Sequence, residues 1–407
     1  MSERREPLTQ LPLAQRLSLI APSATSEMFR RVAELTAAGV PLVSLAIGEP
    51  DFTPPVEILK AAQRALDTGP YGYTQVSGLP TLRAAICARS SARRSQVHRP
   101  NEVVVTVGAK HALFQLAQAL FDPGDEILIP TPSWVSYADQ ARLCGAKPVF
   151  LPCAESDGFL PTPAAITAAV NSRTKAIVLC SPNNPTGAAF DEAALLQLAA
   201  ALRGHSFWII LDEIYAELAY AAAGAPSLLT VAPDLRDRII VVDGVSKSYA
   251  MTGFRVGWML APERVAKACE MLQSQSTTNI ATIAQLAATA ALTGDQTCVA
   301  TMRAAYRERR DRFVTALRAI PGLKCSMPLG AFYVFADVRG WYGRRSGERV
   351  LTDDTAVAEW LLDDARVASV PGSAFGGPGY LRFSYATSQA QLDEAVTRIT
   401  AAVARLR

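Results

Sequence analysis

A lysine at position 247 lies in a stretch of small and apolar residues with no acid to neutralise it. The stretch "VSKSYAMTGFRVGW" covers residues 245–258, and its other charged residue is Arg255. Either the Lys247 side chain reaches solvent, as most lysines do, or its amine is used. A buried lysine loses its preference for the charged form, so its amine can act as a nucleophile and as a base.

Short apolar runs alternate with helical patterns between residues 100 and 260. These runs are nearly continuous in Val, Ile and Leu, which is typical of strands buried on both faces. The alternation predicts an α/β fold with a mostly parallel sheet covered by helices. The runs cover residues 102–108, 125–132, 147–152, 175–182, 207–213 and 238–244.

The residues that follow these runs are candidates for a binding site, because ligands of open α/β sheets bind beyond the carboxyl ends of the strands. A glycine turn that begins a helix, Gly108 to Lys110, suits a phosphate group. Trp134 offers a flat surface for stacking. The other candidates are the amide Asn184, the acid Asp212 with Tyr215 after it, and Ser246 beside Lys247.

Pyridoxal phosphate is the cofactor that requires this set. It needs an amine for a Schiff base, an acid to keep its ring nitrogen protonated and an aromatic stacking partner. Its phosphate needs a cation, which the planar guanidinium of Arg255 can supply. Lys247 is then uncharged in the resting state because it is bonded to the cofactor.

Several motifs together resemble one family, the class I aminotransferases, which are fold-type I pyridoxal-phosphate enzymes. The resemblance runs from about Ser23 to the C-terminus, with the motifs in the family's order. Three further stretches, "TVGAKHALF", "PSWVSY" and "SQSTTNIATIAQ", are most similar to the bacterial branch of aspartate and prephenate aminotransferases. The main motifs are "LAIGEPDF", "YGYTQVSGLPTLR", "SPNNPTG", "DEIY", "SKSYAMTGFRVGW" and "LRFSYA".

The resemblance implies a role for each candidate at the cofactor. Lys247 is expected to be the Schiff-base lysine and proton shuttle, and Asp212 to pair with the ring nitrogen. Gly244 stands where some members have a serine, so the phosphate cup is expected to lose one minor donor. The remaining expected contacts are Asn184 and Tyr215 at the ring hydroxyl, Trp134 stacked on the ring, and Gly108, Ala109, Lys110, Ser246 and Arg255 around the phosphate.

The resemblance also implies how substrates and a second subunit contribute. Tyr73 resembles a tyrosine that reaches the neighbouring subunit's phosphate, which implies a homodimer with shared active sites. Arg382 is expected to bind the substrate α-carboxylate with its planar fork, and Lys110 the distal carboxylate of aspartate or glutamate. Gly48 is expected to leave room for the α-carboxylate, Trp134 and Asn184 to touch the substrate, and Arg16 to assist prephenate.

The function implied is pyridoxal-phosphate-dependent transamination between an amino acid and a 2-oxo acid. Aspartate with 2-oxoglutarate is the preferred pair, and prephenate is a possible second acceptor. The alternatives are a broad-range aromatic or alanine aminotransferase, a C–S β-lyase, and a non-enzymatic sensor domain. The last alternative usually needs an N-terminal DNA-binding domain, for which about 25 residues are too few.

Composition sets broad limits. The net charge of +3 argues against dedicated nucleic-acid binding, and the basic cluster at 89–100 is expected to be a solvated helix end rather than a phosphate site. Seven cysteines without a CxxC pair fit reduced thiols in the cytoplasm. No stretch suggests a signal peptide or a membrane span. Three histidines without metal-binding spacing predict no metal.

At 407 residues the chain is expected to form two domains. Residues 51–294 are predicted to form the large cofactor-binding domain. Residues 295–407 are predicted to form a smaller α+β domain, which residues 1–50 join through an arm and a helix at 26–39. Within the small domain, residues 339–354 are predicted to be a polar and mobile loop.

Overall fold

The computed structural model describes residues 13–20, 24–222 and 224–407. A seven-stranded sheet has the order β2-β8-β7-β6-β5-β3-β4. Six strands are those predicted from the apolar runs, and all six are parallel; β8 is antiparallel to both neighbours. The strands are β2 (Val103–Val107), β3 (Glu126–Thr131), β4 (Lys147–Pro152), β5 (Thr174–Cys180), β6 (Trp208–Asp212), β7 (Ile239–Gly244) and β8 (Val256–Leu260).

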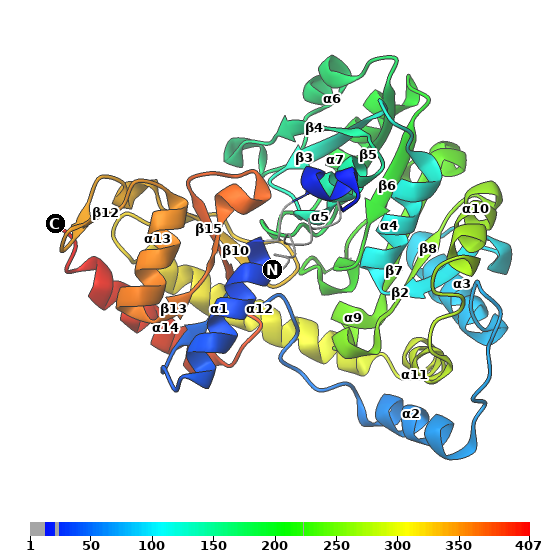
Figure 1. Ribbon diagram of the computed structural model, residues 1–407, viewed down its shortest axis with the longest axis horizontal. Helices are drawn as coiled ribbons and strands as arrows, with labels where there is room; N and C mark the ends of the chain where they lie inside the picture. Colours follow the sequence, from blue (N-terminus) through cyan, green and yellow to red (C-terminus); the bar gives the residue numbers. More distant parts are fainter. Residues whose placement is uncertain (1–12, 21–23, 223) are drawn as a thin grey trace, which may run out of the picture.

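The apolar runs are continuous because successive side chains of each strand enter different cores. In β6, Ile209 and Leu211 pack into one core and Ile210 into the other. The first core contains side chains of α3 (Pro80–Arg94), α6 (Pro163–Ala169), α7 (Glu192–Arg203), α8 (Leu228–Val231) and α11 (Thr282–Thr293). The second contains side chains of α4 (Ala109–Leu120), α5 (Ser136–Leu143) and α10 (Glu263–Ser274). This is an α/β fold with helices on both faces of the sheet (Figure 1).

A second, smaller sheet has the order β14-β15-β10-β9 and is antiparallel. Nearby, β1 (Val43–Ser44) pairs in parallel with β13 (Val367–Ala368). The strands of the small sheet are β9 (Lys324–Cys325), β10 (Tyr333–Asp337), β14 (Val370–Pro371) and β15 (Tyr380–Ser384), and the helices near it are α1 (Ala24–Ala37), α12 (Thr297–Arg318), α13 (Asp354–Trp360), which continues as one π turn at Leu361–Ala365, and α14 (Gln389–Val403).

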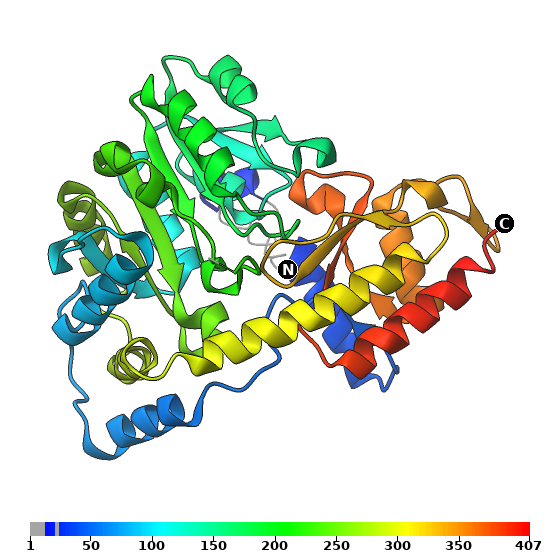
Figure 2. The same cartoon turned by 180° about the vertical axis from the view of Figure 1, so that it is seen from behind.

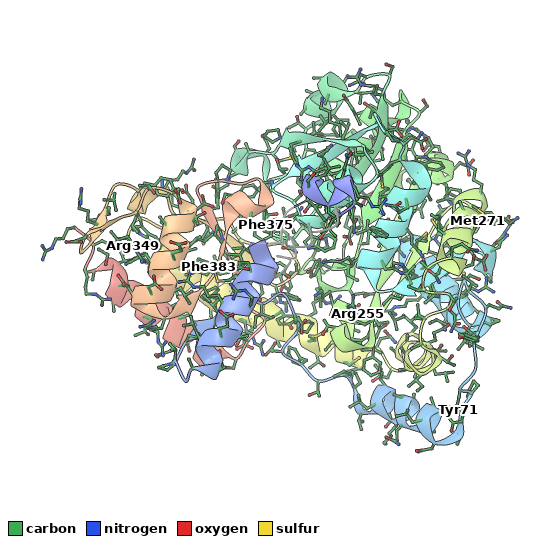
Figure 3. The ribbon with its side chains drawn as sticks, in the orientation of Figure 1. Tyr71, Arg255, Met271, Arg349, Phe375 and Phe383 are labelled. Carbon is green, nitrogen blue, oxygen red and sulfur yellow. The ribbon has the colours of Figure 1, made fainter. Side chains whose placement is uncertain are left out.

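One long helix, α12, joins the two bodies. Its first turn places Val299 in the core beside the large sheet, whereas Met302 and Tyr306 belong to the core of the small body. Seen from behind, the helix runs obliquely from the lower part of the large body into the small body (Figure 2). The helix α2 (Val56–Thr68) packs against α11, away from the seven-stranded sheet. Tyr71 lies beyond its outer end (Figure 3).

Residues 339–354 are more regular than the predicted loop. They contain a 3-10 turn (Arg339–Trp341) and a hairpin of β11 (Arg345–Ser346) and β12 (Arg349–Val350). The backbones of Arg345 and Arg407 exchange two hydrogen bonds, which attaches the hairpin to the C-terminal residue. The mobility of this segment stays a prediction. No helix in the described ranges is long and apolar enough to cross a membrane.

Candidate active site

A cavity of about 330 Å³ lies at the carboxyl edge of the seven-stranded sheet, between this sheet and the small body. Its volume is within the range of small-molecule sites. Most residues singled out from the sequence line it, although they come from segments far apart in the chain. They are Gly48, Ala109, Lys110, Trp134, Asn184, Asp212, Tyr215, Ser246, Lys247, Arg255 and Arg382.

Lys247 is in the short helix α9 (Val245–Ser248), directly after β7. Its Nζ donates a 2.6 Å hydrogen bond to the backbone carbonyl of Gly48. Burial lowers the pKa of Lys247 to about 8, against a smaller raising effect of Glu49. Among the described residues, no carboxylate lies within 4.0 Å of this amine. The site therefore makes the neutral, reactive form of the amine far more accessible near physiological pH than it is for an exposed lysine.

Asp212 is the last residue of β6 and is 4% exposed. Burial raises its pKa to about 6, although Tyr137 and the Ile214 N–H donate hydrogen bonds to its two oxygens at 2.7 and 3.2 Å. Neither donor carries a charge. A cationic ligand group beside Asp212 would stabilise the ionised carboxylate.

Arg382 is on β15 and faces the cavity from the small body. It is 3% exposed, and it donates to Oδ1 of Asn184 at 2.9 Å and to the Ala46 carbonyl at 2.7 Å. Its Nε is buried without a hydrogen-bond partner, and burial lowers the pKa of the guanidinium. Within the described part of the chain it has no acidic partner. A ligand carboxylate suits such a group.

The opposite end of the cavity is suited to an anion. Helix α4 begins at Ala109 without a side-chain cap, so its first N–H groups and its dipole face the cavity. Arg255 donates to the Thr252 carbonyl at 3.0 Å and has no acidic partner among the described residues. Ser246 is buried beside it.

Glycines allow this end to be compact. Gly108 has φ +83°, and a Cβ there would lie 2.8 Å from the Arg255 guanidinium. A Cβ at Gly257 would lie 2.3 Å from the Ala109 nitrogen. The glycine at position 244, where some members of the resembled family have a serine, has a local reason, because a Cβ there would be 2.9 Å from the Val256 carbonyl. A serine at this position requires the neighbouring backbone to shift.

The Lys110 amine lies 4.9 Å from the ring centroid of Trp134. Burial, together with the charge of Arg255, lowers the pKa of Lys110. The amine is thus held over the aromatic wall of the cavity, where a second negative group of a ligand could reach it.

Three residues singled out from the sequence are not in the cavity wall. Gly108 lies against the guanidinium of Arg255, which does line the cavity. Tyr73 is 91% exposed and does not touch the cavity of its own chain. Arg16 is exposed in a 3-10 turn (Gln15–Leu19) that packs against α5.

The structure gives a reason for the glycine at position 48 in addition to the expected room for a substrate carboxylate, which stays a prediction. A Cβ at this position would lie 2.7 Å from the hydroxyl oxygen of Tyr333. Gly48 thus makes room for a tyrosine of this chain, while its carbonyl accepts the Lys247 hydrogen bond.

Sequence reasoning missed several residues of the cavity. Tyr137 holds Asp212, and Tyr333 lies between Tyr215 and Arg382. Tyr137 is within "PSWVSY" and Tyr333 within "GAFYVFADV", but nothing in either stretch marks the tyrosine as functional. Ile214 also lines the cavity, two residues after Asp212.

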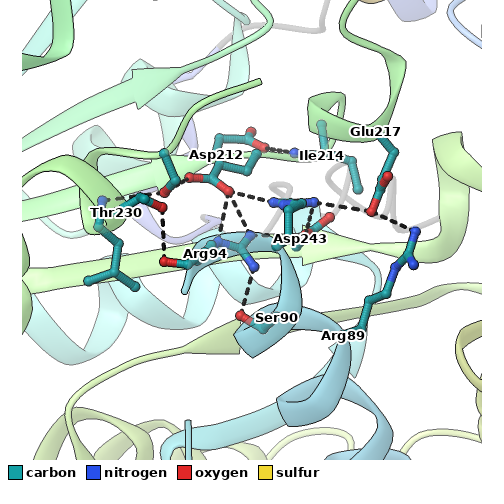
Figure 4. A network of polar contacts seen from close by, with 12 residues as sticks. Arg89, Ser90, Arg94, Asp212, Ile214, Glu217, Thr230 and Asp243 are labelled. Carbon is teal, nitrogen blue, oxygen red and sulfur yellow. Dashed lines mark hydrogen bonds and ion pairs between the residues drawn. The ribbon is translucent and has the colours of Figure 1, made fainter. Parts of the chain in front are cut away.

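The prediction of a solvated helix end at residues 89–100 is wrong for its two central arginines. Arg94 is 1% exposed, and its NH2 lies 2.6 Å from Glu213 and 3.2 Å from Asp243. Arg93 pairs with the same two acids. Burial opposes ionisation of Glu213, but the two arginines lower its pKa to about 2. This network lies next to Asp212 (Figure 4).

The network explains why the ends of β6 and β7 are fixed. Glu213 follows Asp212 at the end of β6, and Asp243 is four residues before Lys247. Helix α3 holds both acids through Arg94, whose NH1 also donates to Ser90 at 2.7 Å. Its charges therefore position the two residues that present an amine and an acid to the cavity.

Fold and site together define an aminotransferase. The chain matches the aminotransferase class I and II family over residues 40–399 and belongs to that family. It is 42% identical to an aspartate aminotransferase of Geobacillus stearothermophilus, over 96% of this chain and 98% of the relative. It is 41% identical to an aspartate/prephenate aminotransferase of Nitrosomonas europaea, over 96% and 99% of the two chains.

Solved structures agree with this assignment. The aspartate aminotransferase of Rhizobium meliloti superposes with a TM-score of 0.94 at 39% identity, covering 98% of this chain and all of that one. The aspartate aminotransferase of Thermus thermophilus with maleate superposes with a TM-score of 0.90 at 40% identity, covering 97% and 100%. The predicted fold class and the predicted family are confirmed.

Proposed function

We propose that this aminotransferase uses pyridoxal 5'-phosphate to transfer the amino group of aspartate to 2-oxoglutarate. One observation carries the proposal: Lys247 and Asp212 line the same cavity, and neither has an ion-pair partner among the described residues. Their pKa values of about 8 and about 6 are those of groups poised for chemistry near neutral pH. When bound, the cofactor supplies an aldehyde that condenses with amines and a ring that withdraws electrons.

The residues of the cavity fit this cofactor. Asp212 would hold a protonated ring nitrogen, whose charge offsets the burial of the carboxylate. Asn184 and Tyr215 would donate to the ring hydroxyl, and Trp134 would stack on the ring. The phosphate would lie at the uncapped start of α4 (Gly108, Ala109 and Lys110), with Ser246 and Arg255.

The proposed substrate contacts follow from cationic side chains that have no acidic partner among the described residues. Arg382 would bind the α-carboxylate, because its buried guanidinium lacks an acidic partner in the described chain and its Nε lacks any partner. Trp134, Asn184 and Gly48 would border the same group. Lys247, on the floor of the cavity, would take the proton from the α-carbon.

The choice of aspartate rests on Lys110, whose amine would bind a distal carboxylate over Trp134. Relatives named aspartate aminotransferase support it, as does the dicarboxylate maleate in the Thermus thermophilus structure. Relatives named aspartate/prephenate aminotransferase support prephenate as a second acceptor.

The proposal includes a homodimer with shared sites. Tyr73 is 91% exposed, and α2 beside it exposes Val56 (60%) and Leu66 (53%). Apolar groups at the edge of the molecule suit burial against a second copy, which would bring Tyr73 to the other copy's phosphate. We also propose residues 51–294 as the large domain and residues 1–50 with 295–407 as the small one. A cytoplasmic location stays a prediction.

The test is a panel of amino acids added one at a time to the reconstituted protein. We expect aspartate and glutamate to convert the visible band of the bound cofactor, with oxaloacetate formed from aspartate. Borohydride reduction of the reconstituted protein before any amino acid is added, followed by peptide mapping, should find the cofactor on Lys247. Pyruvate and ammonia from cystathionine, without oxaloacetate from aspartate, would support a C–S lyase instead. A protein that acquires no visible band would refute the proposal.

A further inference from the structure

Tyr333 contacts two residues of the proposed site, Tyr215 and Arg382. It is the first residue of β10, is 1% exposed, and lines the cavity. Its hydroxyl oxygen is 2.9 Å from the hydroxyl oxygen of Tyr215. Its ring centroid is 4.6 Å from the guanidinium carbon of Arg382. The residue thus contacts one group proposed for the cofactor and one proposed for the substrate.

The ring of Tyr333 determines where the Arg382 guanidinium can lie. Phe375 also contacts this guanidinium, with its centroid 4.9 Å away, and the Ala46 carbonyl accepts from it at 2.7 Å. A cation over aromatic faces is stabilised without a competing acid, so its remaining N–H groups stay free for a carboxylate. Arg382 is on β15, next to β10, so the small sheet sets this contact.

The hydroxyl of Tyr333 determines how the Tyr215 phenol points. Each phenol has one proton, so within the pair one donates and the other accepts. If Tyr215 donates to the ring oxygen of the cofactor, its oxygen must accept from Tyr333. Accepting this bond makes the Tyr215 proton a better donor. Gly48 makes the arrangement possible, because a side chain there would meet the Tyr333 hydroxyl at 2.7 Å.

We propose that Tyr333 is a positioning residue for transamination: its hydroxyl orients the Tyr215 phenol, and its ring holds the guanidinium that binds the substrate α-carboxylate. The inference rests on the proposed function. It adds a residue that acts through Tyr215 and Arg382 rather than on the reacting atoms.

The first test separates the hydroxyl from the ring. Tyr333→Phe keeps the ring and removes the hydroxyl, so Tyr215 donates more weakly to the cofactor's ring oxygen. A weaker donor at that oxygen would favour the protonated form of the bound cofactor. We expect the pH midpoint of the visible absorption to rise by about half a unit to one unit. The KM for aspartate should change less than about twofold, because the ring remains.

The second test removes the ring. Tyr333→Leu should raise the KM for aspartate about tenfold, through loss of the aromatic contact with Arg382. A matched control is Tyr385→Phe, because Tyr385 is also buried and its hydroxyl is 3.0 Å from that of Tyr220, outside the cavity. The control should leave the pH midpoint and the KM unchanged.

A readout without cofactor uses Gly48. In the cofactor-free protein, Gly48→Ala should lower the melting temperature, and Tyr333→Phe should restore part of the loss by removing the atom that the new methyl meets. A wild-type pH midpoint in Tyr333→Phe would overturn the inference while leaving the proposed function intact. A wild-type protein without a pH-dependent band would overturn the proposed function itself.

Discussion

The hydroxyl of Tyr137 donates a 2.7 Å hydrogen bond to Oδ2 of Asp212, joining helix α5 to the end of strand β6. Both side chains are almost completely buried. A neutral donor replaces only part of the water that the carboxylate loses, so the pKa of Asp212 stays raised by burial, at about 6. The cofactor-free protein therefore keeps an unfavourable charge at the centre of its site.

Neutralising Asp212 should stabilise the cofactor-free protein while it abolishes transamination. Between pH 3.8 and about 6 the folded protein holds a proton that the unfolded chain has lost, so stability falls as pH rises through this window. Above pH 6, the raised pKa of Asp212 lowers the free energy of unfolding by about 3 kcal/mol. Asp212→Asn should thus resist urea better than wild type at pH 8, and the gain should vanish below about pH 4.

Asp234→Asn is the matched control, because Asp234 is exposed and Arg203 lowers its pKa. Removing the Asp234 charge should lower the stability slightly, whereas removing the Asp212 charge should raise it. Equal urea midpoints for wild type and Asp212→Asn at pH 8 would show that burial does not destabilise this carboxylate.

Removing the Arg94 side-chain charge should destabilise the protein strongly. Arg94→Met keeps the apolar stem but leaves Glu213 and Asp243 with Arg93 as their remaining cation. A buried ion network broken on one side costs about 3–5 kcal/mol. Urea unfolding measures the lost free energy of unfolding. The control is Arg203→Met, which should change the free energy of unfolding little because Arg203 and Asp234 form an exposed pair. Similar losses of stability in Arg94→Met and Arg203→Met would show that burial does not make the Arg94 network more important than an exposed ion pair.

Lys110 should discriminate between substrates with and without a distal carboxylate. Lys110→Met keeps the stem near Trp134 and removes the charge. The kcat/KM for aspartate should fall about tenfold or more, the scale of one charge-assisted contact, whereas that for alanine should change little. Steady-state rates with the two donors measure the difference. Equal losses of kcat/KM for aspartate and alanine would show that Lys110 does not bind the distal carboxylate.

Shared sites should allow two defective subunits to complement each other. In a hybrid of Lys247→Ala and Tyr73→Leu subunits, one site has both defects and the other has neither. Equal mixing after reversible unfolding should restore about a quarter of wild-type activity, measured as oxaloacetate formation. Each variant alone supplies the baseline. A mixture no more active than the mean of the two would indicate that Tyr73 does not act across a dimer.

Most of the large sheet could be predicted because its strands are buried on both faces and are therefore continuously apolar. The exception is β8, whose Gly257 interrupts the apolar pattern and whose residues lie within the motif around Lys247. The candidate residues could be predicted to meet because they follow parallel strands. Their roles at the cofactor came from the family resemblance instead.

The remaining site residues depend on contacts that no local pattern carries. Arg94 looks like a solvated helix end because Glu213, its acid partner, is 119 residues away. Tyr333 contacts Tyr215, which is 118 residues away, and it reaches Arg382 through the pairing of β10 with β15. An apolar stretch that contains such a tyrosine predicts only a buried strand.

The pairing of β1 with β13 has a consequence for synthesis on the ribosome. Among the described residues, Val43 and Ser44 pair with Val367 and Ala368, each of which is 324 positions later in the sequence (367 − 43 = 324). Strand β1 leaves the exit tunnel long before its partner and must wait, unpaired, until β13 has been synthesised. A nascent chain stalled before β13 would leave that segment open to proteases and chaperones, however well its large sheet had formed.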